Sequence, residues 1–202
     1  AWSNLQTRFL EDLSEAGYPR ESIDTVMCTH LHVDHVGWNT MLVDGQWIPT
    51  FPNARYLIAE EEWRYWDANE DEDTYGPILA DSVRPVVDAG VVDLVSETFQ
   101  VCPEVQLEPT PGHTPGHVSV HISSKGEEAL ITGDCIHHPV QMSRTDWCSS
   151  ADFDQNAGQQ TREKLLEKYV DQDVLIIGTH FATPTAGHVK HLQGGGYWLD
   201  VS

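Results

Sequence analysis

Apolar residues are spaced along the first part of the chain in two ways that predict two kinds of element. Between Leu5 and Leu13 they recur at helical spacing, which predicts an amphipathic first helix ending before Pro19. The short apolar runs 25–29 and 55–59 then predict two buried strands. The first of these strands leads directly into a histidine-rich loop.

Helical patterns follow the second apolar run. An acidic and aromatic helix is predicted over 60–68, and another over 77–88, closed by Gly90.

The second half of the chain is richer in strand patterns. Strands are predicted at 105–108, 118–122, 129–132 and 174–177, with a helix at 161–170. Apolar and polar residues alternate in the second strand, which predicts a half-buried strand, whereas the last is apolar throughout, which predicts full burial. Strands that alternate with helices indicate a layered α/β architecture.

Composition is that of a globular protein, with 202 residues and 40% hydrophobic residues. This length predicts one domain, 1–202. No apolar run reaches the roughly 20 residues that span a bilayer, and the start has no basic segment before an apolar stretch, so neither a membrane protein nor a signal peptide is predicted. We expect a cytoplasmic protein, with export left open because the natural start can lie upstream.

The charge balance is strongly acidic, with 11 Lys and Arg against 32 Asp and Glu and a formal net charge of −21. Such a surface repels phosphate backbones, so nucleic acid is not an expected partner. The four cysteines are widely separated, which predicts free thiols rather than disulfides or a cysteine zinc site.

The segment 29–35 carries four metal-capable side chains directly after a predicted strand. His30 and His32 alternate along an extended segment and can reach one ion together. Asp34 and His35 follow where the chain turns, and can face a second ion. Imidazole and carboxylate suit zinc, and also manganese, iron or cobalt.

Three further signals stand at predicted strand ends. The turn 110–117 presents His113 and His117, Asp134 follows an apolar strand, and His180 ends the most apolar strand. Alone, each is typical of a turn or cap. Together with the first motif they supply enough ligands for two ions that share a carboxylate, although the residues alone do not decide between the two histidines of the turn.

The series HLHVDH (30–35), GHTPGH (112–117), TGD (132–134) and GTH (178–180) resembles the metallo-β-lactamase-fold hydrolase superfamily, and within it the lactonase and arylesterase-like branch. The resemblance extends from about residue 25 to 188. It implies an α/β fold in the form of a four-layer αβ/βα sandwich. The family places several strands ahead of the histidine loop, so the domain is expected to lack N-terminal strands.

Carried over by position, the resemblance implies a set of seven metal ligands. The first ion would be held by His30, His32 and His117, the second by Asp34, His35 and His180, and Asp134 would bridge both. His113 would then be a turn residue or a partner of the ligands.

The activity that this resemblance implies is hydrolysis of an ester, lactone or related bond in a small molecule by a metal-bound hydroxide, with two divalent ions, zinc first. Asp34 could also accept a proton, and Asp134 would act through both ions. His137 stands where lactone-cleaving relatives carry a tyrosine, which argues against a strict quorum-signal lactonase. It could serve as an electrophile or proton donor, or simply face solvent in a loop.

Aromatic residues gather near the metal motif at Trp38, Trp63, Tyr65 and Trp66. They could line an apolar substrate pocket, pack in the core, or form the contact of a homodimer. His188 is a candidate partner of the metal ligands, whereas His121 and His191 are interpreted as structural.

Two alternatives of other classes stand beside the hydrolase. One is an inactive metal-binding remnant, suggested by the missing strands, and the other is a mononuclear-iron sulfur oxygenase on the same fold. A true β-lactamase also fits the motifs, whereas the acidic surface disfavours a nuclease. The sequence does not identify the substrate.

Overall fold

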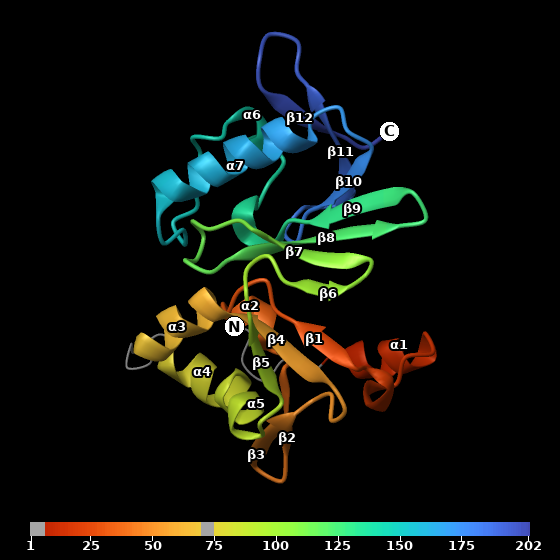
Figure 1. Cartoon of the computed structure of the whole chain (residues 1–202), viewed down its shortest axis with the longest axis vertical. Coiled ribbons are helices and arrows are strands. Elements are labelled where there is room, and N and C mark those ends of the chain that lie inside the picture. Colours follow the sequence, from red (N-terminus) through yellow and green to blue (C-terminus); the bar gives the residue numbers. More distant parts are fainter. Residues whose placement is uncertain (1–6, 70–74) are drawn as a thin grey trace. The chain divides into compact units, whose positions relative to one another are not determined.

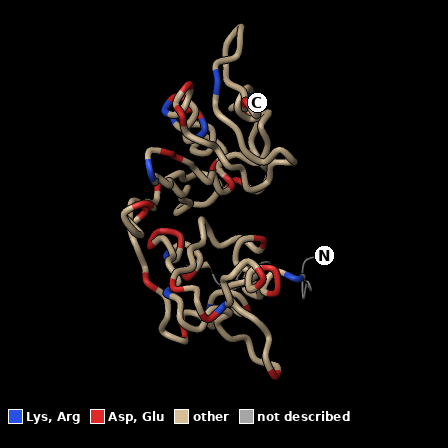
Figure 2. The backbone as a smooth tube through the Cα atoms, turned by 90° about the vertical axis from the view of Figure 1, so that its right-hand side faces the viewer, with Lys and Arg blue, Asp and Glu red and all other residues tan. Residues whose placement is uncertain are grey.

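The computed structural model describes residues 7–69 and 75–202, which belong to two compact units (Figure 1). Of the described residues, the first unit comprises 7–58, 63–69 and 75–95, and the second comprises 59–62 and 96–202. Within the described ranges, no helix has both the length and the apolar character needed to cross a membrane. Aspartate and glutamate outnumber lysine and arginine along the backbone of both units (Figure 2).

The first unit is built around a small sheet with strand order β1-β4-β5, in which β1 and β4 are parallel, and a separate hairpin of β2 and β3. Helix α3 starts in the second unit and continues into the first. The elements in chain order are α1 (Phe9–Glu15), the 3-10 turn η1 (Arg20–Ser22), β1 (Thr25–Met27), α2 (Val33–Val36), β2 (Thr40–Val43), β3 (Gln46–Pro49), β4 (Arg55–Ala59), α3 (Glu60–Ala68), α4 (Gly76–Ser82), α5 (Arg84–Asp88) and β5 (Val92–Val95).

Helices cover this sheet with apolar side chains. Ile58 of β4 packs with Trp66 of α3 and Leu79 of α4 in one buried cluster. Tyr56 of β4 packs with Val86 of α5 in another. Burial of such side chains stabilises each by about 1.5–3 kcal/mol, so these contacts hold the histidine loop that follows β1 on a rigid base.

The second unit contains a seven-stranded sheet with strand order β12-β11-β10-β9-β8-β7-β6 (Figure 1). Neighbouring strands of this sheet are antiparallel except for β9 and β10, which are parallel. The elements in chain order are β6 (Gln100–Cys102), β7 (Val105–Pro109), β8 (Val118–Ser124), β9 (Glu127–Ile131), the 3-10 turn η2 (Gly133–Cys135), α6 (Val140–Ser143), α7 (Gln155–Tyr169), β10 (Val174–Ile177), β11 (Ala186–His191) and β12 (Tyr197–Asp200).

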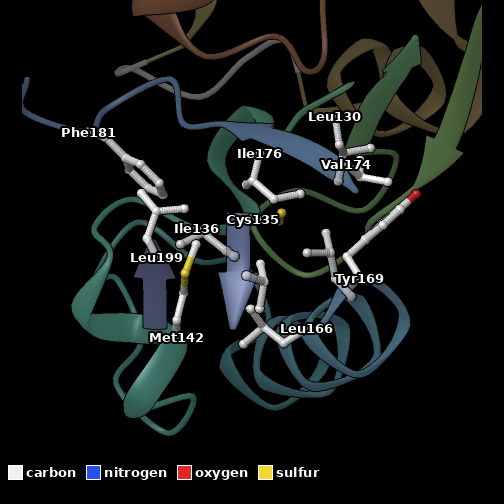
Figure 3. Packing of buried hydrophobic residues seen from close by; sticks show 12 residues of the cluster. Leu130, Cys135, Ile136, Met142, Leu166, Tyr169, Val174, Ile176, Phe181 and Leu199 are labelled. Carbon is white, nitrogen blue, oxygen red and sulfur yellow. The ribbon is translucent and has the colours of Figure 1, made fainter. Parts of the chain in front are cut away.

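One buried cluster joins helix α7 to this sheet (Figure 3). Leu166 and Tyr169 of the helix pack with Ile176 of β10 and Leu199 of β12. The Tyr169 ring lies in the cluster while its hydroxyl points away (Figure 3), and that hydroxyl donates to Glu108 Oε2 over 2.6 Å. Helix α7 thus connects β9 to the parallel strand β10 and covers the sheet between them.

The parallel pair determines where functional side chains emerge. Ile131 of β9 is the register partner of Ile177 of β10. Because parallel strands end at the same edge, the residues that follow them, Asp134 and His180, emerge side by side.

The predicted elements are found with several corrections. The helix expected over 77–88 is two helices, α4 and α5, because Pro85 cannot donate a backbone hydrogen bond and starts a new helix instead. Helix α7 begins at Gln155 rather than 161, with the Asp154 side chain capping it. Leu5, predicted to start the first helix, lies outside the described residues.

Burial along the strands also differs from the prediction. Ser119 of β8 is fully buried, so the expected half-buried alternation fails there, whereas β10 alternates between buried and half-buried positions rather than being buried throughout. Strands β2, β3, β5, β6, β11 and β12 were not predicted, because their short runs mix polar with apolar residues.

Candidate metal centre

The histidine loop of the first unit brings four expected ligands together. The His30 ring lies 4.7 Å from that of His32 and 4.0 Å from that of His35, between centroids. His35 Nε2 lies 3.5 Å from Asp34 Oδ2. Four metal-capable side chains therefore cluster within one short segment, as the sequence predicts.

The local backbone explains this cluster. His32 is extended, with φ −70° and ψ 159°, and immediately precedes the short helix α2. The His35 amide donates to the His32 carbonyl over 3.0 Å, which closes the turn. The chain is thus bent at His30, extended at His32, and turns at Asp34 and His35.

A second cluster surrounds Asp134 in the second unit. Asp134 is buried, and its Oδ2 lies 3.1 Å from His180 Nε2. The same oxygen lies 3.4 Å from Nε2 of His113 and 3.4 Å from Nε2 of His137. The ligand atoms of His113, Asp134 and His137 all lie within 4.8 Å of one another. Three imidazoles around one carboxylate form a donor set that fits a divalent cation.

His117, one of the predicted ligands, is held by the protein through both ring nitrogens. Its Nε2 accepts the Asp134 backbone N–H over 2.9 Å, so in the neutral ring the proton lies on Nδ1, which donates to Thr110 Oγ1 over 2.8 Å. Thr110 Oγ1 in turn lies 3.0 Å from Ser119 Oγ, which donates to the Thr132 carbonyl. This chain accounts for the burial of Ser119, and it ties the His117 ring to the turn that carries Asp134.

His113 has the arrangement expected of a metal ligand. Its Nδ1 lies 2.9 Å from Asp152 Oδ1, while its Nε2 is directed to Asp134. Metal-bound histidines commonly donate their other N–H to a carboxylate, which fixes the ring. Of the two histidines of GHTPGH, the first directs its Nε2 to Asp134 Oδ2, whereas the second, which the resemblance implied as the ligand, contacts the Asp134 amide and Thr110.

Asp152 and Arg162 form a buried ion pair behind His113 that the sequence analysis missed. Asp152 Oδ2 lies 3.6 Å from Arg162 Nη1 and accepts the Ser149 amide over 3.0 Å. Burial alone raises the pKa of the Asp152 carboxyl, but its hydrogen bonds with His113 and Ser149 and the nearby charges outweigh burial and hold that pKa below its usual value. One signal was available: Arg162 falls on the same helical face as Leu165 and Leu166, where a charged residue needs a buried partner.

His137 faces the Asp134 cluster rather than solvent. Its ring stacks on that of His180 at 5.5 Å between centroids, with 18° between the planes. Its backbone amide donates to Gln141 Oε1 over 2.7 Å, which fixes the loop. Its Nδ1 is buried and has no hydrogen-bond partner among the described residues, an arrangement that leaves one nitrogen for a bound ion, water or substrate.

The other histidines singled out in the sequence lie beside carboxylates away from the two clusters. His121 Nε2 lies 3.6 Å from Glu128, His188 Nε2 lies 3.5 Å from Asp173, and His191 Nδ1 lies 2.7 Å from Asp171. His121 and His191 fit the structural interpretation. His188 contacts an exposed carboxylate rather than a predicted metal ligand.

The aromatic residues favour packing over an open pocket. Trp66 is buried in a core cluster of the first unit, and Trp63 and Tyr65 pack against that cluster. Trp38 packs against Phe9 at 5.1 Å between ring centroids. Trp66 also contacts the His32 ring at 5.6 Å, so core packing here supports the metal loop.

These features define an α/β protein with histidine and aspartate clusters of the metal-binding kind. The family model of the metallo-beta-lactamase superfamily matches residues 2–180, and the chain belongs to that superfamily. The family and the α/β fold predicted from the four motifs are therefore confirmed.

Known proteins similar to the chain include lactonases. An N-acyl homoserine lactonase of Bacillus cereus is 26% identical over 176 residues, which are 87% of this chain and 62% of the relative. A lactonase of the same name from Bacillus sp is 25% identical over the same share of each chain. The chain thus spans about 62% of the length of these curated relatives.

Solved structures share the fold. The hydrolase AbOPH of the beta-lactamase superfamily superposes with a TM-score of 0.80 at 27% identity, covering 96% of this chain and 70% of that one. The dizinc quorum-quenching lactonase AidC, solved with N-hexanoyl-homoserine product, superposes with a TM-score of 0.81 at 24% identity, covering 99% and 71%. At 24% identity, the similarity to AidC shows a shared fold alone.

Proposed function

We propose that this chain is a metal-dependent hydrolase that holds two divalent cations and cleaves an ester, lactone or related bond. The observation that carries the proposal is the gathering of Nε2 of His113, His137 and His180 within 3.4 Å of one oxygen of Asp134. Membership of the metallo-beta-lactamase superfamily and the similarity to N-acyl homoserine lactonases support it.

The proposed ligand set keeps the sequence prediction with one exchange. His113 replaces His117, because both ring nitrogens of His117 are engaged in hydrogen bonds with Asp134 and Thr110. The proposed ligands are His30, His32, Asp34, His35, His113, Asp134 and His180. Imidazole with carboxylate favours zinc, with manganese, iron and cobalt as alternatives.

Bound at such ligands, two cations lower the pKa of a water molecule and polarise the carbonyl or phosphoryl group under attack. The chain's own residues supply the rest. Asp134 presents one carboxylate oxygen to three imidazoles, and Asp34 lies beside His35, where it can accept a proton. His137 keeps its buried Nδ1 for the substrate or leaving oxygen.

The proposed substrate is a small neutral or weakly anionic ester, lactone or phosphotriester. The acidic composition disfavours nucleic acid, since a net charge of −21 repels phosphate backbones. Histidine at 137 favours a broader ester specificity over strict quorum-signal lactonase activity. A cytoplasmic location and a homodimer stay predictions, which fractionation of the native host and light scattering of the purified protein test.

The test is metal analysis combined with a hydrolysis panel. Protein loaded with zinc or manganese is assayed on lactones, aryl esters, phosphotriesters and β-lactams. Two metal ions per chain with turnover of any ester-like substrate support the proposal. Metal binding without turnover supports the inactive remnant, and one iron per chain with sulfur oxidation supports the oxygenase.

A further inference from the structure

Behind His113 lies a buried chain of charged groups that the proposed hydrolytic chemistry does not itself use. Asp152 and Arg162 are 9% and 1% exposed, and their side chains pair at 3.6 Å. Burying two charges is unfavourable unless each has specific partners, so the pair calls for a physical reason. The contacts of Asp152 supply that reason.

The two oxygens of Asp152 have different partners. Oδ2 accepts the Ser149 backbone N–H over 3.0 Å and faces the Arg162 guanidinium. Oδ1 faces His113 Nδ1 at 2.9 Å. Both partners of Oδ2 are donors that cannot become acceptors, because one is an amide and the other a guanidinium. Oδ2 must therefore be an acceptor, and the orientation of the carboxylate is fixed.

Arg162 is itself held rigidly. Its Nε donates to the Thr145 carbonyl over 3.2 Å, and Nη2 donates to Cys148 Sγ over 3.0 Å. Nη1 donates to the Cys135 carbonyl over 3.4 Å, in addition to facing Asp152. The guanidinium is thus fixed by contacts beside Asp134, which precedes Cys135 in the turn η2.

The backbone around His113 is fixed by the same segment. The Phe153 amide donates to the His113 carbonyl over 3.0 Å, and the Asp154 amide donates to the Gly112 carbonyl over 2.9 Å. Both the main chain and the ring of His113 are therefore held by residues 152–154. A small displacement of Asp152 would be transmitted to the ring.

We propose that Asp152 is a positioning residue that keeps the proton of His113 on Nδ1, so that Nε2 is available as a metal-binding atom beside Asp134. This inference rests on the proposed function, and it names a residue that determines how tightly the proposed site binds metal. Arg162 and the Ser149 amide enforce the arrangement, because they orient the Asp152 carboxylate toward His113.

The asymmetry of the two oxygens predicts what asparagine would do at this position. In Asp152→Asn the amide oxygen has to occupy the Oδ2 place, facing Arg162 and the Ser149 amide. The amide NH₂ then faces His113 Nδ1, which must become an acceptor. The His113 proton moves to Nε2, and the atom facing Asp134 loses its capacity to bind metal.

The experiment is nitrogen NMR of histidine-labelled, metal-free protein, followed by zinc titration. His113→Gln assigns the His113 signals by their disappearance. In the wild-type protein we expect a protonated Nδ1, and in Asp152→Asn an unprotonated Nδ1 with zinc affinity lowered 10- to 100-fold at one site. Asp154→Asn is the matched control, because asparagine also caps helix α7, and it should leave both readouts unchanged.

An unprotonated Nδ1 of His113 in the wild-type protein would overturn the inference without any variant. So would an Asp152→Asn protein that keeps Nδ1 protonated and binds zinc normally. If Asp152→Asn does not fold, the wild-type spectrum still decides. Because the proton is located without metal or substrate, a negative hydrolysis panel leaves this result standing and counts against the proposed activity alone.

Discussion

Asp134 and His180 each lie three residues beyond a pair of register partners, Ile131 and Ile177, in adjoining parallel strands. Their side chains meet at 3.1 Å between Oδ2 and Nε2. The sheet therefore determines their separation, and a loop of different length after either strand would move one ligand away from the other.

Asp134→Asn should weaken metal binding and reduce turnover by at least about a hundredfold, because an amide lacks the charge that three imidazoles and a cation share. Equilibrium dialysis against zinc and the hydrolysis panel measure both effects. Asp146→Asn, an exposed acid of the same unit, is the control. Near-native rates with full metal content in Asp134→Asn would contradict a central role for this carboxylate.

His113→Ala and His117→Ala should have different effects, which separates the ligand from the supporting histidine. Loss of His113 should remove metal from the centre and also leave the buried Asp152 Oδ1 without its partner, so the metal content rather than the melting temperature separates the two variants. Loss of His117 leaves the Asp134 amide and Thr110 without their partner, at about 1–3 kcal/mol per buried group. Elemental analysis and thermal unfolding of both variants are the measurements. If instead His117→Ala is stable and metal-free while His113→Ala stays loaded, the exchange of ligands is wrong.

His137→Ala should lower turnover more than it lowers metal content, because the buried Nδ1 is proposed to face the substrate. His138→Ala is the natural control, since His138 is adjacent but exposed. Steady-state kinetics on the best substrate of the panel, with metal content measured in parallel, provide the comparison. Equal rates for both variants and the wild type would show that His137 has no role in turnover and is only part of the loop.

Gly112→Ala should destabilise the second unit, whereas Gly158→Ala should be tolerated. A Cβ on Gly112 would lie 2.3 Å from the Gly158 backbone nitrogen, and Gly112 has φ +134°. A Cβ on Gly158 would meet nothing nearer than Arg162 Nη1 at 3.4 Å and would improve helix propensity by about 0.5–1 kcal/mol. Chemical denaturation of the two variants should shift in opposite directions. A Gly112→Ala protein as stable as the wild type would refute the close approach.

Cys135 should resist alkylation in the folded protein. Burial raises the pKa of its thiol to about 12, so the thiol stays protonated at any pH below that value and reacts slowly. Cys102 is exposed and should be modified first by iodoacetamide at pH 8. Peptide mass spectrometry reads both sites, with guanidine-unfolded protein as the control in which both react. Fast labelling of Cys135 in folded protein would contradict its burial.

The clusters were predictable where the ligands are local in sequence. His30, His32, Asp34 and His35 form a cluster because an extended segment turns into a helix, and that change is encoded in neighbouring residues. Asp134 and His180 were predictable as strand-end residues, and the family resemblance implied that they meet at one ion. The residues alone do not show that they are neighbours, because only the pairing of β9 with β10 brings them together.

The choice between His113 and His117 could not be predicted from the residues. Both lie in one Pro/Gly turn, and the difference is made by partners distant in sequence, Asp152 for the first and the Asp134 amide for the second. The buried Arg162 was missed for a similar reason, since its pairing with Asp152 depends on how helix α7 packs. Several short strands were missed because polar residues interrupt their apolar patterns.

The hydrogen bonds that lead from His117 through Thr110 and Ser119 to the Thr132 carbonyl all point in the same direction. Each group donates a hydrogen bond to the next, and the last acceptor is a carbonyl, which cannot donate and so cannot reverse the order. Grafting this turn onto another scaffold would therefore require moving all three side chains together with the carbonyl, because the two hydroxyls can donate or accept and take their direction only from the carbonyl end.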